Sequence, residues 1–387
     1  MENNNITVLV KPTHRCNLNC KYCYEKEPRE FYGDKLMPPE YIDKLLEVLK
    51  KGYSKVQLTW HGGEPLLAGE EWYDEVYKYI NKHNSKKFEI KCSMQSNGYL
   101  YEKYKEMIKK YNINYSVSFD FLDDNCNRTI SNNKSKLEEN IFNNNIGTIS
   151  VVNDSSKLID TYNVLKEKYD NNIKAGGISF NVIFENKEFE NKDILNKYIE
   201  NWKQYLNYVF YDKDNKEFEE RISIDFFKIV LGYKSVLCNH KECMKTFLCL
   251  DVDGWIYHCD RFWKPIFKFV NINEINYPTE IFTSENYKKM LSNHLDIKFK
   301  CSLECPVYDF CNSGCIADRN FKDDGTMSLN KNQCVINKEL LIHCFNLVKN
   351  LSCEDVDKIN PVIYKLIFDK GYLPLSECNN IEVIKDL

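Results

Sequence analysis

The sequence predicts an α/β fold in which a parallel sheet closes partly into a barrel. Six runs rich in β-branched and aromatic residues alternate with amphipathic segments of helical periodicity. This alternation is typical of parallel sheets, because successive parallel strands need a long crossover connection, usually a helix. Polar turns follow the first strands, and ligands of such sheets bind at the carboxyl ends of the strands. We therefore expect six strand–helix units with a site at that edge.

The expected strands are short and apolar. They cover Ile6–Val10, Val56–Trp60, Phe88–Met94, Ile113–Phe119, Thr148–Val152 and Ile178–Phe184. The expected helices cover Pro39–Lys51, Glu70–His83, Tyr101–Tyr111, Lys136–Asn144, Lys157–Tyr169 and Ile194–Tyr211. Pro38 and Pro39 fit the start of a helix, where prolines are common.

Length, charge and composition limit the possible functions. The 387 residues suffice for one large domain and a smaller one. The net charge of −4 argues against a general nucleic-acid binder and gives no sign of membrane-surface binding. The polar N-terminus lacks the features of a signal peptide, and no apolar stretch is long enough to span a bilayer. We expect a soluble cytoplasmic protein, in which ligation explains 17 cysteines better than disulfides do.

A cysteine triplet follows the first expected strand. Cys16, Cys20 and Cys23 form a C-x3-C-x2-C pattern. Three thiolates in one loop suit a four-iron cluster and leave one iron open to a small molecule. A structural zinc site needs four ligands, and this loop has no further ligand at zinc-like spacing. His14, just before the triplet, is expected to be an ordinary loop residue. A chance run in a cysteine-rich chain is the alternative.

The triplet resembles the signature of the radical S-adenosylmethionine (SAM) superfamily, C-x3-C-x-aromatic-C, with Tyr22 as the aromatic residue. In that family SAM binds the open iron of a [4Fe-4S] cluster through its amino and carboxylate groups. The reduced cluster then cleaves SAM to methionine and a 5′-deoxyadenosyl radical. The resemblance implies a barrel of six strand–helix units and an electron donor such as flavodoxin or ferredoxin.

A glycine-rich turn, Gly62-Gly63-Glu64-Pro65, follows the second expected strand. Two glycines let a ligand approach the backbone closely, and a carboxylate can accept hydrogen bonds from an ammonium group. On its own this is a weak signal of a turn. Together with the triplet it resembles the GGEP motif of the family, which holds the amino group of SAM. The resemblance assigns that role to Gly62, Gly63 and Glu64.

Polar residues after the third and fourth strands are weaker candidates. Gln95-Ser96-Asn97-Gly98 is similar to a Gln-Thr-Asn-Gly stretch of family members, which makes Asn97 a candidate SAM contact. Strand alternation can direct Ser118 toward the barrel interior, and Arg128 could pair with the SAM carboxylate. Relatives often read Ser-x-Asp-Gly-Pro here, whereas this chain continues with Phe121-Leu122. Ordinary turn and cap roles are the alternative for each residue.

A second cysteine-rich region runs from Cys238 to Cys334. A zinc ribbon would explain one pair of these cysteines, but not so many thiols without His. The pattern resembles the SPASM domain, which follows the barrel in many peptide-modifying radical SAM enzymes and holds up to two auxiliary four-iron clusters. The chain departs from that framework by one extra residue between Cys301 and Cys305.

The SPASM resemblance implies two ligand sets. The first auxiliary cluster would take Cys238, Cys243, Cys259 and Cys315, and the second would take Cys301, Cys305, Cys311 and Cys334. Cys249 competes with Cys238 for the first site. We favour Cys238 because Cys249 begins an apparent strand, Cys249–Val252, whose turn is Asp253-Gly254. The remaining cysteines, expected to be ordinary, are Cys92, Cys126, Cys344, Cys353 and Cys378.

Asp260 follows Cys259 directly. A carboxylate beside an auxiliary cluster could accept a proton from a substrate radical while the cluster accepts the electron. In the similar anaerobic sulfatase-maturating enzymes the matching Asp is the proposed base. The alternative is a solvated Asp paired with Arg261.

We expect three parts, namely a radical SAM barrel at 1–232, a SPASM domain at 233–350 and a C-terminal helical extension at 351–387. The stretch Val335–Leu387, which includes the extension, reads as amphipathic helices with a break at Pro361 and a turn at 371–374. Nothing in it suggests chemistry, so it is expected to pack on the SPASM domain or to contact a partner.

The resemblance implies hydrogen abstraction from a peptide or protein, followed by oxidation. The main expectation is a maturase that forms a thioether or carbon–carbon crosslink in a ribosomally made peptide, and a separate leader-peptide-binding protein would then be a possible partner. The alternative is an anaerobic sulfatase-maturating enzyme that makes formylglycine. The altered Ser-x-Asp-Gly-Pro stretch and the divergent middle third favour the maturase. Asp260, the full cysteine set and the expected absence of an N-terminal leader-recognition domain favour the alternative.

Two further hypotheses do not involve catalysis. A non-catalytic iron–sulfur electron carrier needs fully ligated clusters, so the open triplet and Gly62-Gly63-Glu64 count against it. A zinc-stabilised binding module would use the barrel only as a scaffold, and its metal content would differ.

Overall fold

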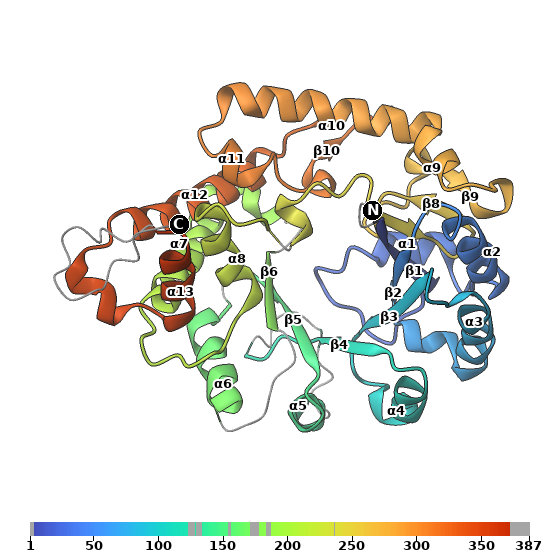
Figure 1. Cartoon of the computed structure of the whole chain (residues 1–387), viewed down its shortest axis with the longest axis horizontal. Helices are drawn as coiled ribbons and strands as arrows, with labels where there is room; N and C mark the ends of the chain where they lie inside the picture. Colours follow the sequence, from blue (N-terminus) through green and yellow to red (C-terminus); the bar gives the residue numbers. More distant parts are fainter. Residues whose placement is uncertain are drawn as a thin grey trace.

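The centre of the molecule is a sheet of nine strands in the order β6-β5-β4-β3-β2-β1-β7-β8-β9 (Figure 1). The computed structural model describes residues 4–122, 128, 134–153, 156–170, 178–182, 187–235 and 237–371. The parallel strands are β1 (Asn5–Thr13), β2 (Lys55–Gly62), β3 (Glu89–Ser96), β4 (Asn114–Ser118), β5 (Gly147–Val152) and β6 (Ile178–Val182). Strand β1 pairs with β2 on one side and with β7 on the other, so the sheet does not close between β1 and β6 and the six strands form an open, partial barrel. The expected α/β class is confirmed.

Helices alternate with the parallel strands and cover the outer side of the curved sheet (Figure 1). They are α1 (Lys26–Tyr32), α2 (Glu40–Leu49), α3 (Glu70–His83), α4 (Tyr101–Lys110), α5 (Lys134–Asn143), α6 (Leu158–Asp170), α7 (Lys192–Phe210) and α8 (Arg221–Val230). The later helices are α9 (Thr279–Thr283), α10 (Glu285–Glu304), α11 (Tyr308–Cys311), α12 (Lys331–Lys349) and α13 (Pro361–Asp369).

The expected strands and helices agree with the structure to within a few residues. The last expected strand, Ile178–Phe184, is described as far as Val182. Helices α1, α8 and α10 were not expected, and α10 contains Cys301 near its end. Pro361 begins α13, where a missing backbone N–H costs nothing. The expected turn at 371–374 and the cysteines at 126 and 378 lie outside the described residues, apart from Gly371.

Aromatic packing fixes the second strand against its helix. Residues of β2 alternate between buried and partly exposed positions, as in a strand with one face in the core. Trp60 of β2 is fully buried and meets Trp72 and Tyr73 of α3 edge-on, with ring centroids 5.6 and 5.8 Å apart. This contact holds the end of β2, from which the Gly-Gly-Glu-Pro turn begins.

Three strands from the cysteine-rich region extend the sheet of the barrel. Strand β7 (Phe247–Leu250) pairs in parallel with β1, and β8 (Trp255–Tyr257) and β9 (Val270–Asn271) follow antiparallel. A separate hairpin consists of β10 (Asn320–Phe321) and β11 (Met327–Ser328). The β1–β7 pairing crosses the expected boundary at residue 232 and brings the chain after β8 close to the end of β1.

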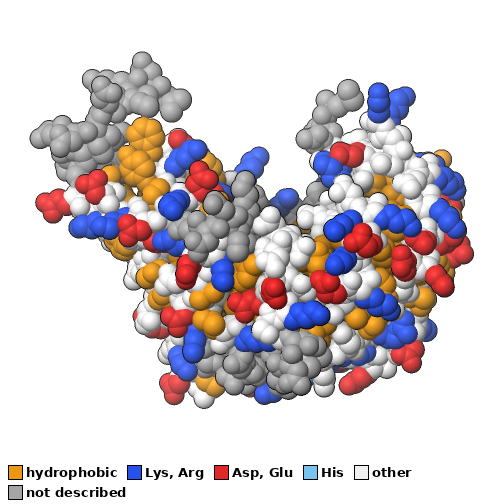
Figure 2. Space-filling view, turned by 90° about the horizontal axis from the view of Figure 1, so that it is seen from below, with side chains coloured by type: hydrophobic (Ala, Val, Ile, Leu, Met, Phe, Trp, Pro, Cys, Tyr) orange, Lys and Arg blue, Asp and Glu red, His pale blue; other side chains and the backbone are white. Residues whose placement is uncertain are grey.

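The surface seen from below, over α4, α5 and α6, carries interspersed positive and negative side chains (Figure 2). No patch of a single sign dominates this face. Among the described residues, no helix is both long enough and apolar enough to cross a membrane.

Candidate active site

The three cysteines of the triplet lie in the loop between β1 and α1. Arg29 Nη1 donates to the Leu18 carbonyl (3.0 Å), and the Leu18 N–H donates to Cys16 Sγ (3.4 Å), so the loop is held from both sides. The pKa of Cys20 is raised to about 11, mainly by burial. The charge of Arg128 lowers this pKa, whereas the nearby thiols of Cys23 and Cys16 raise it. The three thiols are therefore neighbours, as one four-iron cluster requires.

A buried group of four charged side chains lies beneath this loop, and we call it the buried charge cluster: Lys11, His14, Glu25 and Asp251. Lys11 Nζ lies 2.6 Å from Glu25 Oε1. His14 Nδ1 lies 2.8 Å from Glu25 Oε2, and His14 Nε2 lies 2.6 Å from Asp251 Oδ1. All four residues are at most 2% exposed. Asp251 follows β7, so the cluster joins the first strand and the triplet loop to the later cysteine-rich region.

His14 lies in the loop directly after β1, as expected, but it is fully buried and belongs to a charge network that the sequence did not predict. Its ring stacks on Tyr32 with centroids 4.6 Å apart, and both ring nitrogens bind carboxylates. Burial lowers the pKa of His14, but Asp251 and Glu25 outweigh burial and raise the pKa overall. For Glu25, burial is outweighed by Lys11 and His14, which hold the pKa of the carboxyl at about 2. The raised pKa of His14 and the lowered pKa of Glu25 both favour the charged forms, so the charges of the cluster stabilise one another.

The Gly-Gly-Glu-Pro turn packs directly against the segment before the triplet. The Gly63 N–H donates to the Thr13 carbonyl (3.2 Å) and the Glu64 N–H to the Arg15 carbonyl (2.7 Å). A Cβ on Gly63 would lie 2.2 Å from the Arg15 oxygen and 2.4 Å from the His14 oxygen. Both atoms are backbone, so no side chain fits at this position. The glycine thus lets two SAM-binding candidates, the turn and the triplet loop, touch.

Glu64 is fully buried and joins the second motif to the third. Its carboxylate accepts hydrogen bonds from the Leu66 N–H (3.0 Å), the Asn97 N–H (2.8 Å) and Ser96 Oγ (3.0 Å). Burial raises the pKa of Glu64 to about 7, although these hydrogen bonds oppose the rise. Asn97 Nδ2 in turn donates to Asn17 Oδ1 (2.6 Å), and it lies 3.8 Å from Cys16 Sγ. The side chain of Glu64 therefore organises the turns around the triplet.

Tyr22, Asp120 and Arg128 form a second polar group beside the triplet. Tyr22 Oη donates to Asp120 Oδ2, and Arg128 Nε donates to Tyr22 Oη. Arg128 Nε also lies 3.0 Å from Asp120 Oδ2, and its guanidinium lies 5.1 Å from the centroid of the Tyr22 ring. Asp120 is the carboxylate partner that the sequence did not predict. Ser118 lies nearby on β4 and accepts a hydrogen bond from Gln95 Nε2 (2.9 Å).

Asp260 lies where β1, β2 and the triplet loop meet. Its carboxylate accepts a hydrogen bond from Tyr24 Oη, and His61 Nδ1 lies 3.6 Å from its Oδ2. Its backbone carbonyl accepts a hydrogen bond from Lys11 Nζ (2.6 Å), and its side chain remains 15% exposed. Arg261, the partner proposed in the alternative, forms its ion pair with Asp318.

Tyr24 and His61, which lie beside the Asp260 carboxylate, were also missed by sequence reasoning. Burial raises the pKa of Tyr24 far above its usual value, and the charge of Asp260 adds to the rise, so Tyr24 stays a neutral donor. Each residue adjoins a motif, because Tyr24 follows Cys23 and His61 precedes Gly62. Their positions next to these motifs were the only indication in the sequence that they belong to the site.

The cysteines of the second region form two groups of neighbouring thiols. Burial raises the pKa of Cys311 to about 12, and the thiols of Cys334, Cys305 and Cys301 add to the rise. In the other group, burial raises the pKa of Cys243 to about 12, with Cys238 adding to it. Burial also raises the pKa of Cys315, and the thiol of Cys238 adds to that rise. The pKa of Cys259 is raised by burial and, in part, by the thiol of Cys315. Cys315 also lines the small cavity formed by Cys301, Cys305, Cys311 and Cys334, and the division of these cysteines into two ligand sets stays a prediction.

Cys249 lies apart from both groups of thiols. It is fully buried in β7, and its thiol is influenced by Lys11 and Asp251 rather than by another cysteine. His258, also fully buried, has Nε2 3.3 Å from Cys243 Sγ, a neighbour that the sequence did not predict. Within the described residues, no three His, Cys, Asp or Glu side chains are gathered tightly enough for a single metal ion.

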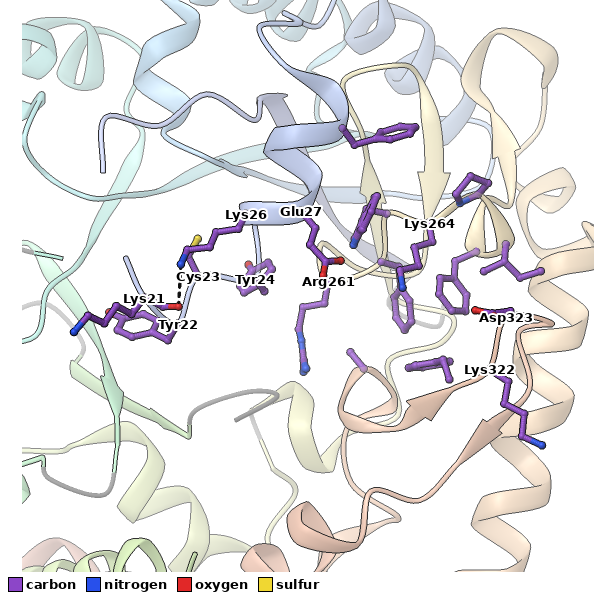
Figure 3. Close-up of a pocket in the computed structure, with 18 residues that line it drawn as sticks. Lys21, Tyr22, Cys23, Tyr24, Lys26, Glu27, Arg261, Lys264, Lys322 and Asp323 are labelled. Atoms are coloured by element: carbon purple, nitrogen blue, oxygen red, sulfur yellow. Dashed lines mark hydrogen bonds between the residues drawn. The ribbon is translucent and has the colours of Figure 1, made fainter. Parts of the chain in front are cut away.

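An open cavity of about 910 Å³ leads outward from this site. Its inner wall contains Tyr22, Cys23 and Tyr24. Its outer wall comes from α1, from the segment 261–267 after β8, and from the β10–β11 hairpin. Figure 3 shows Arg261 between the side chains of the cysteine loop and those of Lys264, Lys322 and Asp323.

Comparison with known proteins agrees with this geometry. Residues 10–143 match the family model described as the radical SAM superfamily. The chain is 26% identical over 346 residues to the "Cysteine-type anaerobic sulfatase-maturating enzyme" of Clostridium novyi (strain NT), covering 80% of this chain and 87% of that relative.

Two solved structures share the fold to different degrees. "Native anSMEcpe with bound AdoMet and Kp18Cys peptide" has a TM-score of 0.72 at 20% identity, covering 95% of this chain and 100% of that one. Streptococcus suis SuiB bound to precursor peptide SuiA has a TM-score of 0.50 at 17% identity, covering 81% and 72%. The fold is thus more similar to the first structure.

Replacing Lys11 tests the buried charge cluster. We expect Lys11→Met to lower the free energy of unfolding by about 3–5 kcal/mol, because it leaves Glu25 and Asp251 with too little positive charge in the interior. Urea unfolding of the protein with its thiols kept reduced measures the effect. The double variant Lys11→Met/Glu25→Gln is expected to recover part of the loss, and a single-variant loss below about 1 kcal/mol would contradict the assignment.

Replacing Gly63 tests the contact between the turn and the triplet loop. We expect Gly63→Ala to displace the loop and to lower 5′-deoxyadenosine formation about 10²-fold, since an ångström-scale misplacement has effects of that order. Gly69→Ala is the control for backbone strain without a clash, because its φ of +88° disfavours a side chain although a Cβ there meets nothing within 4 Å. Equal activity of the two variants would show that the close approach at Gly63 is unimportant.

Proposed function

Because the chain is a radical SAM enzyme, we propose that it oxidises the Cβ of a cysteine in a peptide or protein to the aldehyde formylglycine. The observation that carries this proposal is the position of Asp260. Its carboxylate is held by Tyr24, directly after Cys23 of the triplet, and it stays partly open to solvent. The contact with Tyr24 supports Asp260 as the base, because it links the carboxylate to the loop that carries the cysteine triplet. The similarity to a sulfatase-maturating enzyme over most of both chains supports the same reaction.

The donor set of the site fits the implied cofactors. Three neighbouring thiols suit a [4Fe-4S] cluster with one open iron, and polar groups surround them. The residues proposed to contact SAM are Tyr22, Gly62, Gly63, Glu64, Asn97, Ser118 and Arg128. For Glu64 we propose that the contact comes from the backbone, since its carboxylate is already bound internally.

When bound, SAM with its cluster supplies the radical that takes a hydrogen atom from the substrate, and auxiliary clusters accept the remaining electron. Asp260 takes the proton of the substrate thiol, and Tyr24 orients the carboxylate for that transfer. The net change of the cysteine is the loss of a hydrogen atom, a proton and an electron. Water then replaces sulfur at the resulting carbon–sulfur double bond, which releases hydrogen sulfide and leaves the aldehyde.

We propose two auxiliary [4Fe-4S] clusters as the electron acceptors. The first is assigned to Cys238, Cys243, Cys259 and Cys315, and the second to Cys301, Cys305, Cys311 and Cys334. Cys259 precedes Asp260, so the electron and the proton would leave the substrate at neighbouring positions. A SPASM-type region at 233–350 between the barrel and the C-terminal helices remains part of this proposal, as does a flavodoxin or ferredoxin that reduces the SAM cluster.

Peptide crosslinking, the main expectation from the sequence, has less support than its alternative. The similarity that spans most of both chains is to a sulfatase-maturating enzyme, and the fold resembles SuiB less closely. The two reactions differ in the fate of sulfur. Formylglycine formation releases sulfur from the peptide, whereas a thioether or carbon–carbon crosslink retains it. A separate leader-peptide-binding protein would be needed only for crosslinking.

Substitution of Asp260 separates radical formation from peptide oxidation. We expect Asp260→Asn to continue forming 5′-deoxyadenosine but to lower aldehyde formation about 10²–10⁴-fold, because the proton acceptor is lost. Mass spectrometry of a cysteine-containing peptide measures the aldehyde, and chromatography measures 5′-deoxyadenosine. Cys20→Ala is expected to abolish both products.

Asp253→Asn is the matched control, since Asp253 lies in the turn between β7 and β8, before the strand that Asp260 follows, and pairs with Lys268 instead of Tyr24. It should leave both products unchanged. The proposal fails if Asp260→Asn still oxidises the peptide at the normal rate, or if Cys20→Ala still cleaves SAM.

A further inference from the structure

The cavity described above reaches Tyr24, whose hydroxyl binds the carboxylate of the proposed base, Asp260. Lys264 and Lys322 line the same cavity and are exposed. Its volume of about 910 Å³ lies at the upper end of the range for ligand pockets, which is roughly 300–1,000 Å³. A segment of extended peptide fits such a cavity with its reactive residue at the inner end. A substrate would therefore contact these walls on either side of that residue.

The charge of the cavity differs from that of the whole chain. Its lining contains the cations Lys21, Lys26, Arg261, Lys264 and Lys322 but only the carboxylates Glu27 and Asp323. The whole chain has 53 Lys and Arg against 57 Asp and Glu, so the excess of cations is local.

Among the described residues, most of these cations have no carboxylate partner. Arg261 is the exception and is bound to Asp318. In the part of the chain that the structure describes, the ion pairs include none with Lys21, Lys264 or Lys322. Lys264 and Lys322 are exposed, and Lys264 Nζ lies 5.9 Å from the centroid of the Trp263 ring. An acidic ligand would meet these charges without displacing a partner.

An aromatic wall lies beside the cations. Phe262, Phe267 and Phe321 pack against one another with ring centroids 5.0–5.4 Å apart. Phe31, 59% exposed, meets Trp263 with centroids 5.8 Å apart. Phe262 and Phe267 are buried, so the apolar surface that is open to a ligand side chain comes from Phe31, Trp263 and Phe321. Aromatic and cationic groups together favour a peptide that carries acidic and apolar residues.

We propose that this cavity binds the substrate through an acidic segment, rich in Asp or Glu and containing an apolar side chain, next to the residue that is oxidised. The inference rests on the proposed function and names the class of peptide on which it acts. Lys264 and Lys322 attract the carboxylates at the mouth, and the aromatic wall binds the apolar side chain. The substrate cysteine then reaches Tyr24 and Asp260.

Binding of two labelled peptides tests the proposal on anaerobically reconstituted protein with SAM. One fluorescein-labelled peptide has a cysteine followed by several Glu and a Phe, and in the other each Glu is Gln. Fluorescence anisotropy gives the Kd of each. We expect the Glu peptide to bind about tenfold more tightly, and to lose that advantage as salt is raised from about 0.05 to 0.5 M.

Charge reversal locates the binding. Lys264→Glu/Lys322→Glu should weaken binding of the Glu peptide about tenfold or more and leave the Gln peptide nearly unaffected. Lys86→Glu/Lys87→Glu is the matched control, because both residues are exposed in the turn before β3 and are distant from the cavity lining. Iron content and thermal melting show that each variant is folded.

The inference is overturned if both peptides bind equally, or if the two double variants behave alike. It is also overturned if single-stranded DNA displaces the Glu peptide as effectively as an unlabelled Glu peptide, because the site would then select charge alone. A Glu peptide that binds tightly through Lys264 and Lys322 but keeps its cysteine unoxidised would support the inference while sinking the proposed function.

Discussion

Burying four charged side chains beneath the cysteine triplet is the constraint on which the rest of the structure depends. Lys11, His14, Glu25 and Asp251 come from the first strand, the triplet loop and the turn after β7. A charge in the protein interior is stable only when it is paired. Removing any one partner therefore leaves an unpaired buried charge, which destabilises the folded state. The cluster therefore requires strand and loop segments distant in sequence to take one relative position, before any cofactor is bound.

That position brings together the groups that the proposed chemistry needs. Lys11 binds both Glu25, two residues after Cys23, and the backbone of Asp260. The pairing of β7 with β1 also joins the cysteine-rich region to the first strand, in this case through backbone hydrogen bonds. The triplet loop and the proposed base thus share Lys11 as a common contact. The aromatic and cationic cavity opens from this support, so the peptide would approach both groups from one side.

Much of the fold was predictable because its signals are local. Strand and helix periodicity located β1 to β6 and α2 to α7, and the order of motifs placed the triplet and the Gly-Gly-Glu-Pro turn at adjacent strand ends. Helix α10 was not found, although it is long, because the cysteine spacing was read as a loop framework. Sequence spacing predicts two sets of auxiliary cysteines, but spacing alone could not show where Cys249 lies. Its place in β7 depends on pairing with a strand more than two hundred residues earlier.

The polar contacts of the site were the least predictable. His14 and Asp251 are 237 positions apart, and nothing near either residue reveals the other. Asp120 was visible as a strand-end residue, but its pairing with Arg128 and Tyr22 depends on how the loops fold over the sheet. Tyr24 and His61 acquire meaning only once Asp260 lies between them.

The most direct test of the central claim is the iron content of anaerobically reconstituted protein, measured together with 5′-deoxyadenosine release from SAM under dithionite. We predict about twelve irons per chain, from three four-iron clusters, and release of 5′-deoxyadenosine. About four irons with 5′-deoxyadenosine release would retain the radical SAM site and reject the auxiliary clusters. Zinc in place of iron, with SAM left intact, would contradict the proposed enzyme altogether.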